Sequence, residues 1–227
     1  RIAFVADLAS NWARLRRKAN EDKSLALILS DYPARRGRGG YAIGLDAQAS
    51  ALEIIAALRQ AGYRLGETIA ATQSSLIRAL EDAAQTVSFP LADYQRLLQT
   101  LPADFVASVT EAWGAAQDDP AITDCCFRFS CIEDGALVLA LQPDRGARHD
   151  RYESYHDMQR APRHAYVAFY LWLRHVRNID ALIHLGAHGT LEWLPGKSVM
   201  LSESCAPEAV LGPTPLIYPF IVNDPGE

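Results

Sequence analysis

Apolar residues recur along the chain with the two periods that distinguish strands from helices. Apolar runs typical of strands buried in a parallel sheet predict strands at residues 24–30, 179–185 and 216–222. Further strands are predicted at residues 1–7, 125–131, 136–141 and 198–201. Apolar spacing of three and four predicts helices at residues 8–18, 48–61, 74–84, 91–98, 105–113, 165–176 and 207–211. An Asp-Gly pair at 134–135 predicts a tight turn between two of the strands.

The order of these elements predicts an α/β fold. Strands and helices alternate in residues 1–66, helices dominate residues 67–120, and strands and helices alternate again in residues 121–227. We therefore expect two parallel-sheet-type α/β portions joined by a helical connector, with the chemistry in the last portion. Because the chain starts within an apolar run and stops after an Asn-Asp-Pro-Gly turn, we expect it to be an internal fragment of a larger multidomain protein.

Composition excludes several classes of protein. The 227 residues are 49% hydrophobic and 22% charged, which is enough for a sizeable core. The formal net charge of −5 and the lack of a long basic run argue against nucleic-acid binding. No apolar run reaches the length of a membrane span. The four cysteines have no C-x-x-C spacing, which favours reduced thiols and a cytoplasmic protein.

Histidines are concentrated in one segment. All six lie between His149 and His188, and a histidine can bind a metal or move a proton near neutral pH. His149 is expected to be solvated, and His175 is expected to be structural at the end of a helix. For His156, His164 and His184 the sequence leaves two alternatives open, a metal ligand or a satisfied structural residue.

The strongest candidate site is the turn after the strand at 179–185. Glycines flank His188, and Glu192 follows it four residues later. Ligand sites in open α/β sheets form just beyond the carboxyl ends of the strands. A carboxylate beside an imidazole suits proton abstraction or weak metal binding, so we take Glu192 and His188 as the candidate catalytic pair.

Three familiar motifs are incomplete in this region. The spacing of His184 and His188 matches a metalloprotease, but position 185 is Leu where that motif needs Glu. Residues 196–198 match the end of a phosphate-binding loop, but Leu191 replaces its first glycine. No G-x-S-x-G elbow is present. The sequence therefore predicts no ATP site of its own.

Several long motifs together resemble the large, tetrapyrrole-binding subunits of the CobN/magnesium chelatase family, most closely those of the CobN type. The resemblance covers most of the chain and is densest from 142 to 227. It rests on HLGAHGTLEWLPGKSV, SESCAPEAVLGPTPLIYPFIVNDPGE, the Gln-Pro-x-Arg-Gly at 142–146, the Tyr-His-Asp at 155–157 and the helix that follows His164.

The resemblance implies an enzyme that inserts cobalt into a corrin precursor, hydrogenobyrinic acid a,c-diamide, in aerobic cobalamin biosynthesis. It implies that cobalt is the substrate ion, and that AAA+ partner subunits of the CobS/CobT type hydrolyse ATP with Mg. In that setting Glu192 would be the base or metal shuttle beside His188. The remaining expected roles are metal binding by His156, His164 and His184, and substrate binding by Arg145, Tyr155, Trp193 and Lys197.

Three alternatives stay open at this point. The chain could belong to a magnesium chelatase large subunit that acts on protoporphyrin IX. It could be a non-catalytic tetrapyrrole-binding module. It could also be a zinc hydrolase that uses His184, His188 and Glu192.

Overall fold

A computed structural model of the chain describes residues 1–30, 45–69, 72–81, 86–146, 157–186, 191, 194–196 and 202–219. The helices are α1 (Ile2–Arg17), α2 (Ala47–Gln60), α3 (Gln73–Glu81), α4 (Leu91–Leu98), α5 (Ala103–Trp113), α7 (His164–His175) and α8 (Ala206–Leu211), with short 3-10 helices η1 (Asn20–Asp22) and η3 (Ala116–Asp118). The strands are β1 (Leu25–Leu29), β2 (Thr86–Pro90), β3 (Ile122–Thr123), β4 (Cys126–Asp134), β5 (Leu137–Leu141), β6 (Ala181–Leu185) and β7 (Leu216–Ile217).

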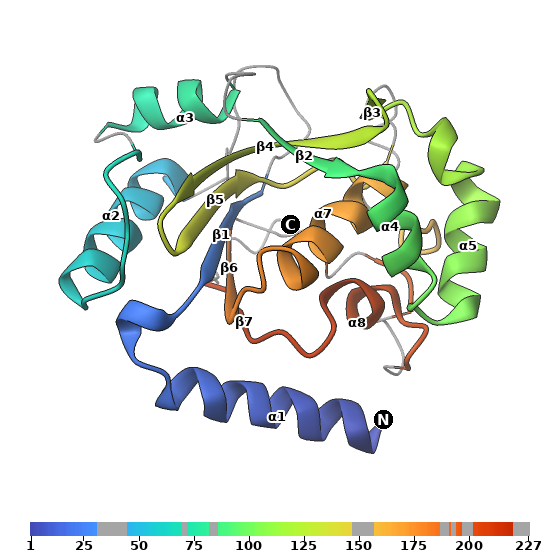
Figure 1. Cartoon of the computed structure of the whole chain (residues 1–227), viewed down its shortest axis with the longest axis horizontal. Coiled ribbons are helices and arrows are strands. Elements are labelled where there is room, and N and C mark those ends of the chain that lie inside the picture. The colour runs from blue at the N-terminus through green and yellow to red at the C-terminus, as the bar shows by residue number, and fades with distance from the viewer. Residues whose placement is uncertain are drawn as a thin grey trace.

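The described strands form one mixed sheet (Figure 1). Its order is β2-β4-β5-β1-β6-β7, with β3 beside β4. The half around β1 is parallel, because β1 pairs in parallel with β5 and β6, and β6 pairs in parallel with β7. The other half is antiparallel, since β4 runs against β5, β2 and β3. All four parallel strands therefore end at the same edge of the sheet.

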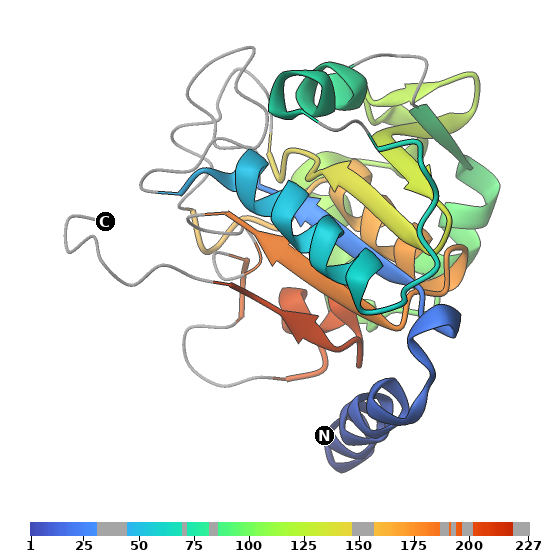
Figure 2. The same cartoon turned by 90° about the vertical axis from the view of Figure 1, so that its left-hand side faces the viewer.

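Each face of the sheet has its own apolar core. One face packs against α7, which is buried from His164 to Leu173. The opposite face packs against α2 and α3, and Figure 2 shows α2 in front of the sheet with α7 behind it. Alternation along β1 divides its side chains: Ala26 and Ile28 face α7, whereas Leu25, Leu27 and Leu29 face α2. All five are buried, as expected for a strand covered on both sides.

The α/β class predicted from sequence is confirmed, and the two predicted portions contribute to one sheet. Strand β1, from residues 1–66, lies between β5 and β6, from residues 121–227. Two element predictions are wrong. Residues 1–7, predicted as a strand, begin α1, because a short apolar run alone does not distinguish the two structures. The predicted helical connector also contains β2, which pairs with the edge of β4.

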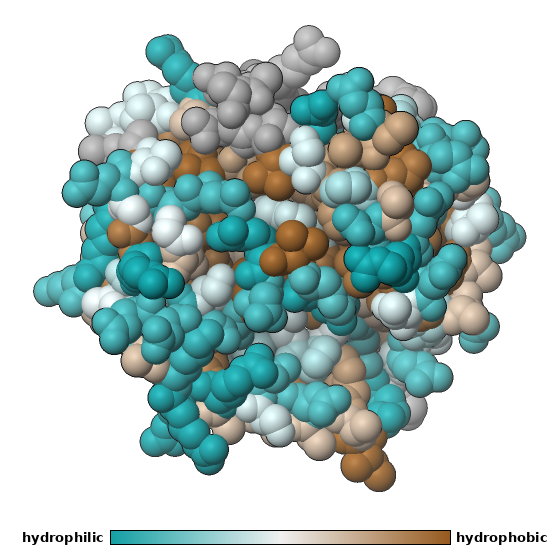
Figure 3. Space-filling model, viewed as in Figure 1, coloured by the Kyte–Doolittle hydropathy of each residue, from teal (hydrophilic) through white to brown (hydrophobic). Residues whose placement is uncertain are grey.

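Helix α1 stands beside the body of the molecule at the bottom of Figure 1. Polar contacts attach it, including Lys18 Nζ to Asp180 Oδ2 at 2.6 Å and Asn11 Nδ2 to the carbonyl of Pro213 at 2.7 Å. Ile2 and Val5 are exposed, and apolar atoms show at the lower margin of the surface over the start of α1 (Figure 3). Across the described helices, α1 included, none combines the length and apolar character needed to cross a bilayer.

Candidate functional site

Polar side chains gather where the parallel strands end. The face of the sheet under α7 is apolar along β1 and β5 until their carboxyl ends, where Ser30 and Gln142 follow. His184 lies on the same face of β6, since Leu182 two residues earlier packs in the α7 core. Ser30, Gln142 and His184 are all buried, and Tyr218 follows β7. We call Ser30, Gln142, His184 and Tyr218 the edge row.

His184 occupies the centre of the edge row. The residue is 1% exposed, and its Nε2 lies 3.2 Å from the hydroxyl of Ser30. The imidazole stacks on the ring of Tyr218, with centroids 5.6 Å apart and planes at 28°. Burial lowers the pKa of His184 to about 4, because the charged form loses its hydration. The imidazole is therefore neutral at physiological pH, and its contacts link residues of three strand ends.

Gln142 joins the edge row to α7. Its Nε2 donates to the hydroxyls of Tyr166 at 3.1 Å and Tyr170 at 2.5 Å. Its Oε1 is buried and has no hydrogen-bond partner among the described residues. Buried polar atoms are nearly always paired, so an unpaired acceptor at this edge calls for a specific explanation.

His164 has a different environment at the start of α7. Its Nδ1 accepts a hydrogen bond from the hydroxyl of Tyr94 at 2.7 Å, and its Nε2 donates to the carbonyl of Gly114 at 3.1 Å. Since a carbonyl can only accept, Nε2 carries a proton. Burial raises the pKa of Tyr94 well above its ordinary value, and the charge of Asp119 adds to the effect. Both nitrogens of His164 thus connect α7 to α4 and to the end of α5.

Arg145 is also held by the protein. Its guanidinium donates to the carbonyls of Asp157 and Arg160, and the residue is only 4% exposed. Its own carbonyl accepts from the backbone nitrogen of Arg163 at 2.9 Å. These bonds fix residues 157–163 against the end of β5.

The structure separates the predicted site residues into two sets. His164, His184 and Arg145 are described, and no described contact joins any two of them. The others lie outside the described residues: Tyr155, His156, His188, Glu192, Trp193 and Lys197. Their proposed roles stay predictions. Leu191 and Leu194, on either side of residues 192–193, are 3% and 1% exposed and pack in the core under α7.

Sequence reasoning did not single out Ser30, Gln142 or Tyr218 as site residues. A signal was present, because Ser30 and Gln142 each follow directly on an apolar strand run. In a parallel sheet these positions converge on one edge, but the sequence alone does not reveal which strands are neighbours.

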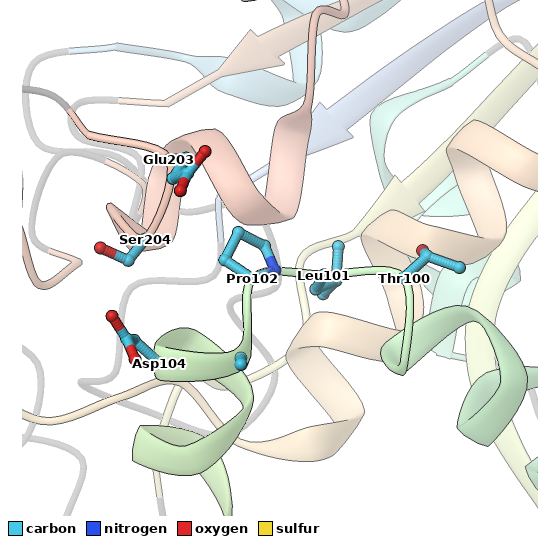
Figure 4. A pocket seen from close by; sticks show the side chains of 7 residues that line it. Thr100, Leu101, Pro102, Asp104, Glu203 and Ser204 are labelled. Atoms are coloured by element: carbon cyan, nitrogen blue, oxygen red, sulfur yellow. The ribbon is translucent and has the colours of Figure 1, made fainter.

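A separate pocket lies between the α4–α5 connection and the turn before α8. Its lining includes Pro102 and Asp104 on one side and Glu203 and Ser204 on the other (Figure 4). None of the predicted site residues that the structure describes lines it. Within the described ranges, no group of three or more His, Cys, Asp or Glu side chains could hold a metal ion.

Comparison with known proteins shows the family of the chain. A sequence profile of the family described as CobN/Magnesium Chelatase matches residues 1–227. The chain belongs to this family. It is 45% identical to the aerobic cobaltochelatase subunit CobN of Pseudomonas aeruginosa, over 100% of the chain and 19% of that protein. It is 30% identical to a magnesium-chelatase subunit of Chlorobaculum parvum, over 100% of the chain and 18% of that protein.

A solved structure of this family has the same fold. The catalytic subunit of cobaltochelatase from Mycobacterium tuberculosis superposes with a TM-score of 0.85 at 39% identity, covering 99% of the chain and 20% of that subunit. The chain thus spans about one fifth of the length of these CobN/magnesium chelatase relatives. The resemblance inferred from the motifs is confirmed at the level of the family.

Proposed function

We propose that the chain is part of the tetrapyrrole-binding, metal-inserting subunit of an ATP-dependent chelatase, with cobalt as the ion and hydrogenobyrinic acid a,c-diamide as the macrocycle. The observation that carries the proposal is the whole-chain identity of 45% to a named cobaltochelatase subunit, against 30% to a magnesium-chelatase subunit. In this proposal AAA+ partners of the CobS/CobT type hydrolyse ATP with Mg in the cytoplasm.

Metal insertion has two chemical requirements. The inner nitrogens of the macrocycle must lose protons, and the ion must exchange its water for those nitrogens. We assign the first role to Glu192, as a base that accepts a ring proton and passes it to solvent, with His188 beside it. A carboxylate and imidazoles bind a divalent ion weakly enough to release it, so His156 is assigned to ion delivery with this pair.

The described geometry favours other roles for His164 and His184. A metal on His164 would have to displace Tyr94 or Gly114 from its ring nitrogens. His184 is enclosed between Ser30 and Tyr218. Metal binding by either residue stays a prediction that the contacts do not favour. Arg145 uses Nη2 for its bonds to Asp157 and Arg160, so its proposed role toward a substrate carboxylate would use the N–H groups of the other two guanidinium nitrogens.

Replacing Glu192 by Gln in the complete subunit, assayed with its ATPase partners, tests the catalytic assignment. We expect the rate of cobalt insertion to fall by about 100-fold or more, because general-base catalysis typically contributes that much. Macrocycle affinity, measured by spectral titration, should stay within about twofold of the parent value, since Gln keeps the shape of Glu. Glu203→Gln is the matched control, because Glu203 is exposed in the turn before α8.

The same titration separates the alternative functions. Tight binding of a corrinoid and weak binding of protoporphyrin IX supports cobalt, and the reverse order supports magnesium. An unchanged insertion rate in Glu192→Gln would remove Glu192 from the mechanism. Binding of a macrocycle with no insertion of either ion would indicate a non-catalytic module. Stoichiometric, tightly held zinc in the purified protein would favour a hydrolase.

A further inference from the structure

Helix α1 has two apolar faces, and the described chain covers only one of them. Leu15 packs against the core on the α2 side of the sheet, and Phe4 and Leu8 on the same face of α1 are partly buried. The other face carries a second apolar row, spaced by three, four and three residues: Ile2, Val5, Ala9 and Trp12. We call this row the outer stripe.

The outer stripe is open to solvent in the described chain. Ile2 is 88% exposed, Val5 57% and Trp12 42%, and they are three of the six large apolar residues that are exposed across the described ranges. Apolar atoms over the start of α1 are visible at the lower margin of Figure 3. Neighbouring members of the stripe lie one helical turn apart, so they form a continuous ridge about 15 Å long. Single exposed apolar residues are ordinary, but a contiguous row marks an interaction surface.

The body of the molecule holds α1 mainly at polar positions. The side chain of Asn11 donates to the carbonyl of Pro213. The ammonium group of Lys18, directly after α1, donates to Asp180. No residue of α1 is fully buried, and a helix of 16 residues is marginally stable in water without packing. A second surface packed on the outer stripe would therefore stabilise α1.

The length of the relatives indicates where that second surface lies. The match to the cobaltochelatase subunit from Mycobacterium tuberculosis covers 99% of this chain, so α1 belongs to the shared fold. It covers only 20% of that subunit, so about four fifths of such a polypeptide lies outside the matched part. A segment of the same polypeptide has a high effective concentration near α1, which favours it over a separate molecule.

We propose that the outer stripe is an interface within the complete subunit: an amphipathic helix from the polypeptide outside residues 1–227 packs its apolar face against Ile2, Val5 and Trp12. Spacing of three and four is that of helix–helix packing, and tryptophan is enriched in the buried centres of interfaces. Arg16 continues the stripe and, like Arg17, is exposed, so the partner helix should carry carboxylates opposite them. This interface follows from the family and the size of its members, and it is independent of the proposed function.

Thiol labelling of the complete subunit tests the interface. Val5→Cys places a thiol in the outer stripe, and Ser10→Cys, at an exposed position on another side of α1, is the matched control. We expect Val5→Cys to react at least about 10-fold more slowly than Ser10→Cys, because a covered thiol reacts only when the interface opens. Mass spectrometry of the labelled peptide measures both rates. Equal rates would show that the stripe is open in the complete subunit and would overturn the proposal.

Proteolysis gives a second measurement. Trypsin cleaves after Arg16 and Arg17 when α1 opens locally. Trp12→Asp places a carboxylate in the interface and should raise the cleavage rate of the complete subunit by about 10-fold. Ser10→Asp adds the same charge about 160° around the helix from Trp12 and should leave the rate unchanged. The same acceleration in both variants, or none in either, would contradict the interface.

Dependence on concentration or on other subunits would identify a different occupant. Protection of Val5→Cys that disappears on dilution would indicate a second copy of the subunit. Protection that appears only after the ATPase partners are added would indicate one of those partners. Either result would overturn the proposal. None of these measurements uses metal insertion, so a failure of the proposed function leaves them unaffected.

Discussion

Two regions of the molecule each bury a histidine, but they differ in how completely polar groups are paired. At the start of α7, His164 has a partner on both ring nitrogens. Nearby, Asp119 accepts from Arg163 at 2.7 Å and from the backbone of Ala121 at 2.9 Å. At the edge row, the part of the chain that the structure describes gives His184 a 3.2 Å contact and a stacked ring, and gives Oε1 of Gln142 no partner.

The difference distinguishes residues that stabilise the fold from residues that we expect to lie near a ligand. A buried polar network whose members are fully paired fixes the arrangement of the elements that supply them, here α4, α5 and α7. An incompletely paired row carries a cost in stability, and such costs are expected near functional sites. The start of α7 therefore holds the fold together, and the carboxyl edge of β5, β1, β6 and β7 is where we expect ligands to act.

Asp119→Ala should have the largest effect on stability. The substitution leaves the guanidinium of Arg163, with a side chain only 10% exposed, without its ion-pair partner. Breaking a buried pair on one side costs about 3–5 kcal/mol, so we expect a loss of that size in the free energy of unfolding measured with urea. Asp93→Ala is the control. It removes the exposed pair with Arg96 and should cost less than about 1 kcal/mol. Equal losses would show that the region is not a structural network.

The pH dependence of stability should report on the edge row. Burial lowers the pKa of His184 in the folded chain from 6.5 to about 4, so only the unfolded chain takes up this proton between those values. The contribution of neutral His184 to the free energy of unfolding is therefore complete above pH 6.5. It decreases by about 3 kcal/mol as the pH falls from 6.5 toward 4. Urea unfolding at several pH values should show this slope in the parent chain, and His184→Phe should lack it. Identical slopes in the two proteins would mean that His184 is not enclosed.

Much of the fold was predictable because its elements have strong local patterns. The runs that became β1 and β6 are apolar almost throughout, and helix α4 was predicted with its observed bounds, Leu91–Leu98. Strand β2 was missed because its pairing with β4 is a tertiary contact that Thr86–Pro90 does not encode locally. For the same reason, the insertion of β1 between β5 and β6 could not be anticipated.

The site prediction rests on position in the fold, and it stays a prediction because His188 and Glu192 lie outside the described residues. It used the order of apolar runs, the clustering of the histidines, the glycines around His188 and the carboxylate of Glu192. The roles of His164 and His184 could not be separated in this way, because both are histidines beside apolar residues. Their partners distinguish them. His164 bonds to the hydroxyl of Tyr94, which is 70 residues away in the sequence, and His184 stacks on the ring of Tyr218. Only the folded structure reveals these two contacts.

His164→Phe should have an intermediate effect. The phenyl ring fills the space of the imidazole but leaves the hydroxyl of Tyr94 and the carbonyl of Gly114 unpaired. An unpaired buried polar group costs about 1–3 kcal/mol. Urea unfolding should show a loss in that range. The double variant with Tyr94→Phe should recover part of it, because removing both partners of a bond costs less than removing one. No recovery would mean that the Tyr94 bond contributes little to the network.

Ser30→Ala should have the smallest effect and gives the most direct comparison of the two regions. The substitution removes one 3.2 Å contact with His184 and leaves the stack on Tyr218 in place. Because this bond is long and neutral, we expect it to contribute about 0.5–1 kcal/mol to the free energy of unfolding, less than His164→Phe removes. Urea unfolding of both variants under the same conditions provides the test. If Ser30→Ala lowered the free energy of unfolding as much as His164→Phe does, the edge row would be bonded as tightly as the start of α7. The pairing of buried polar groups would then no longer distinguish the edge row from the residues that stabilise the fold.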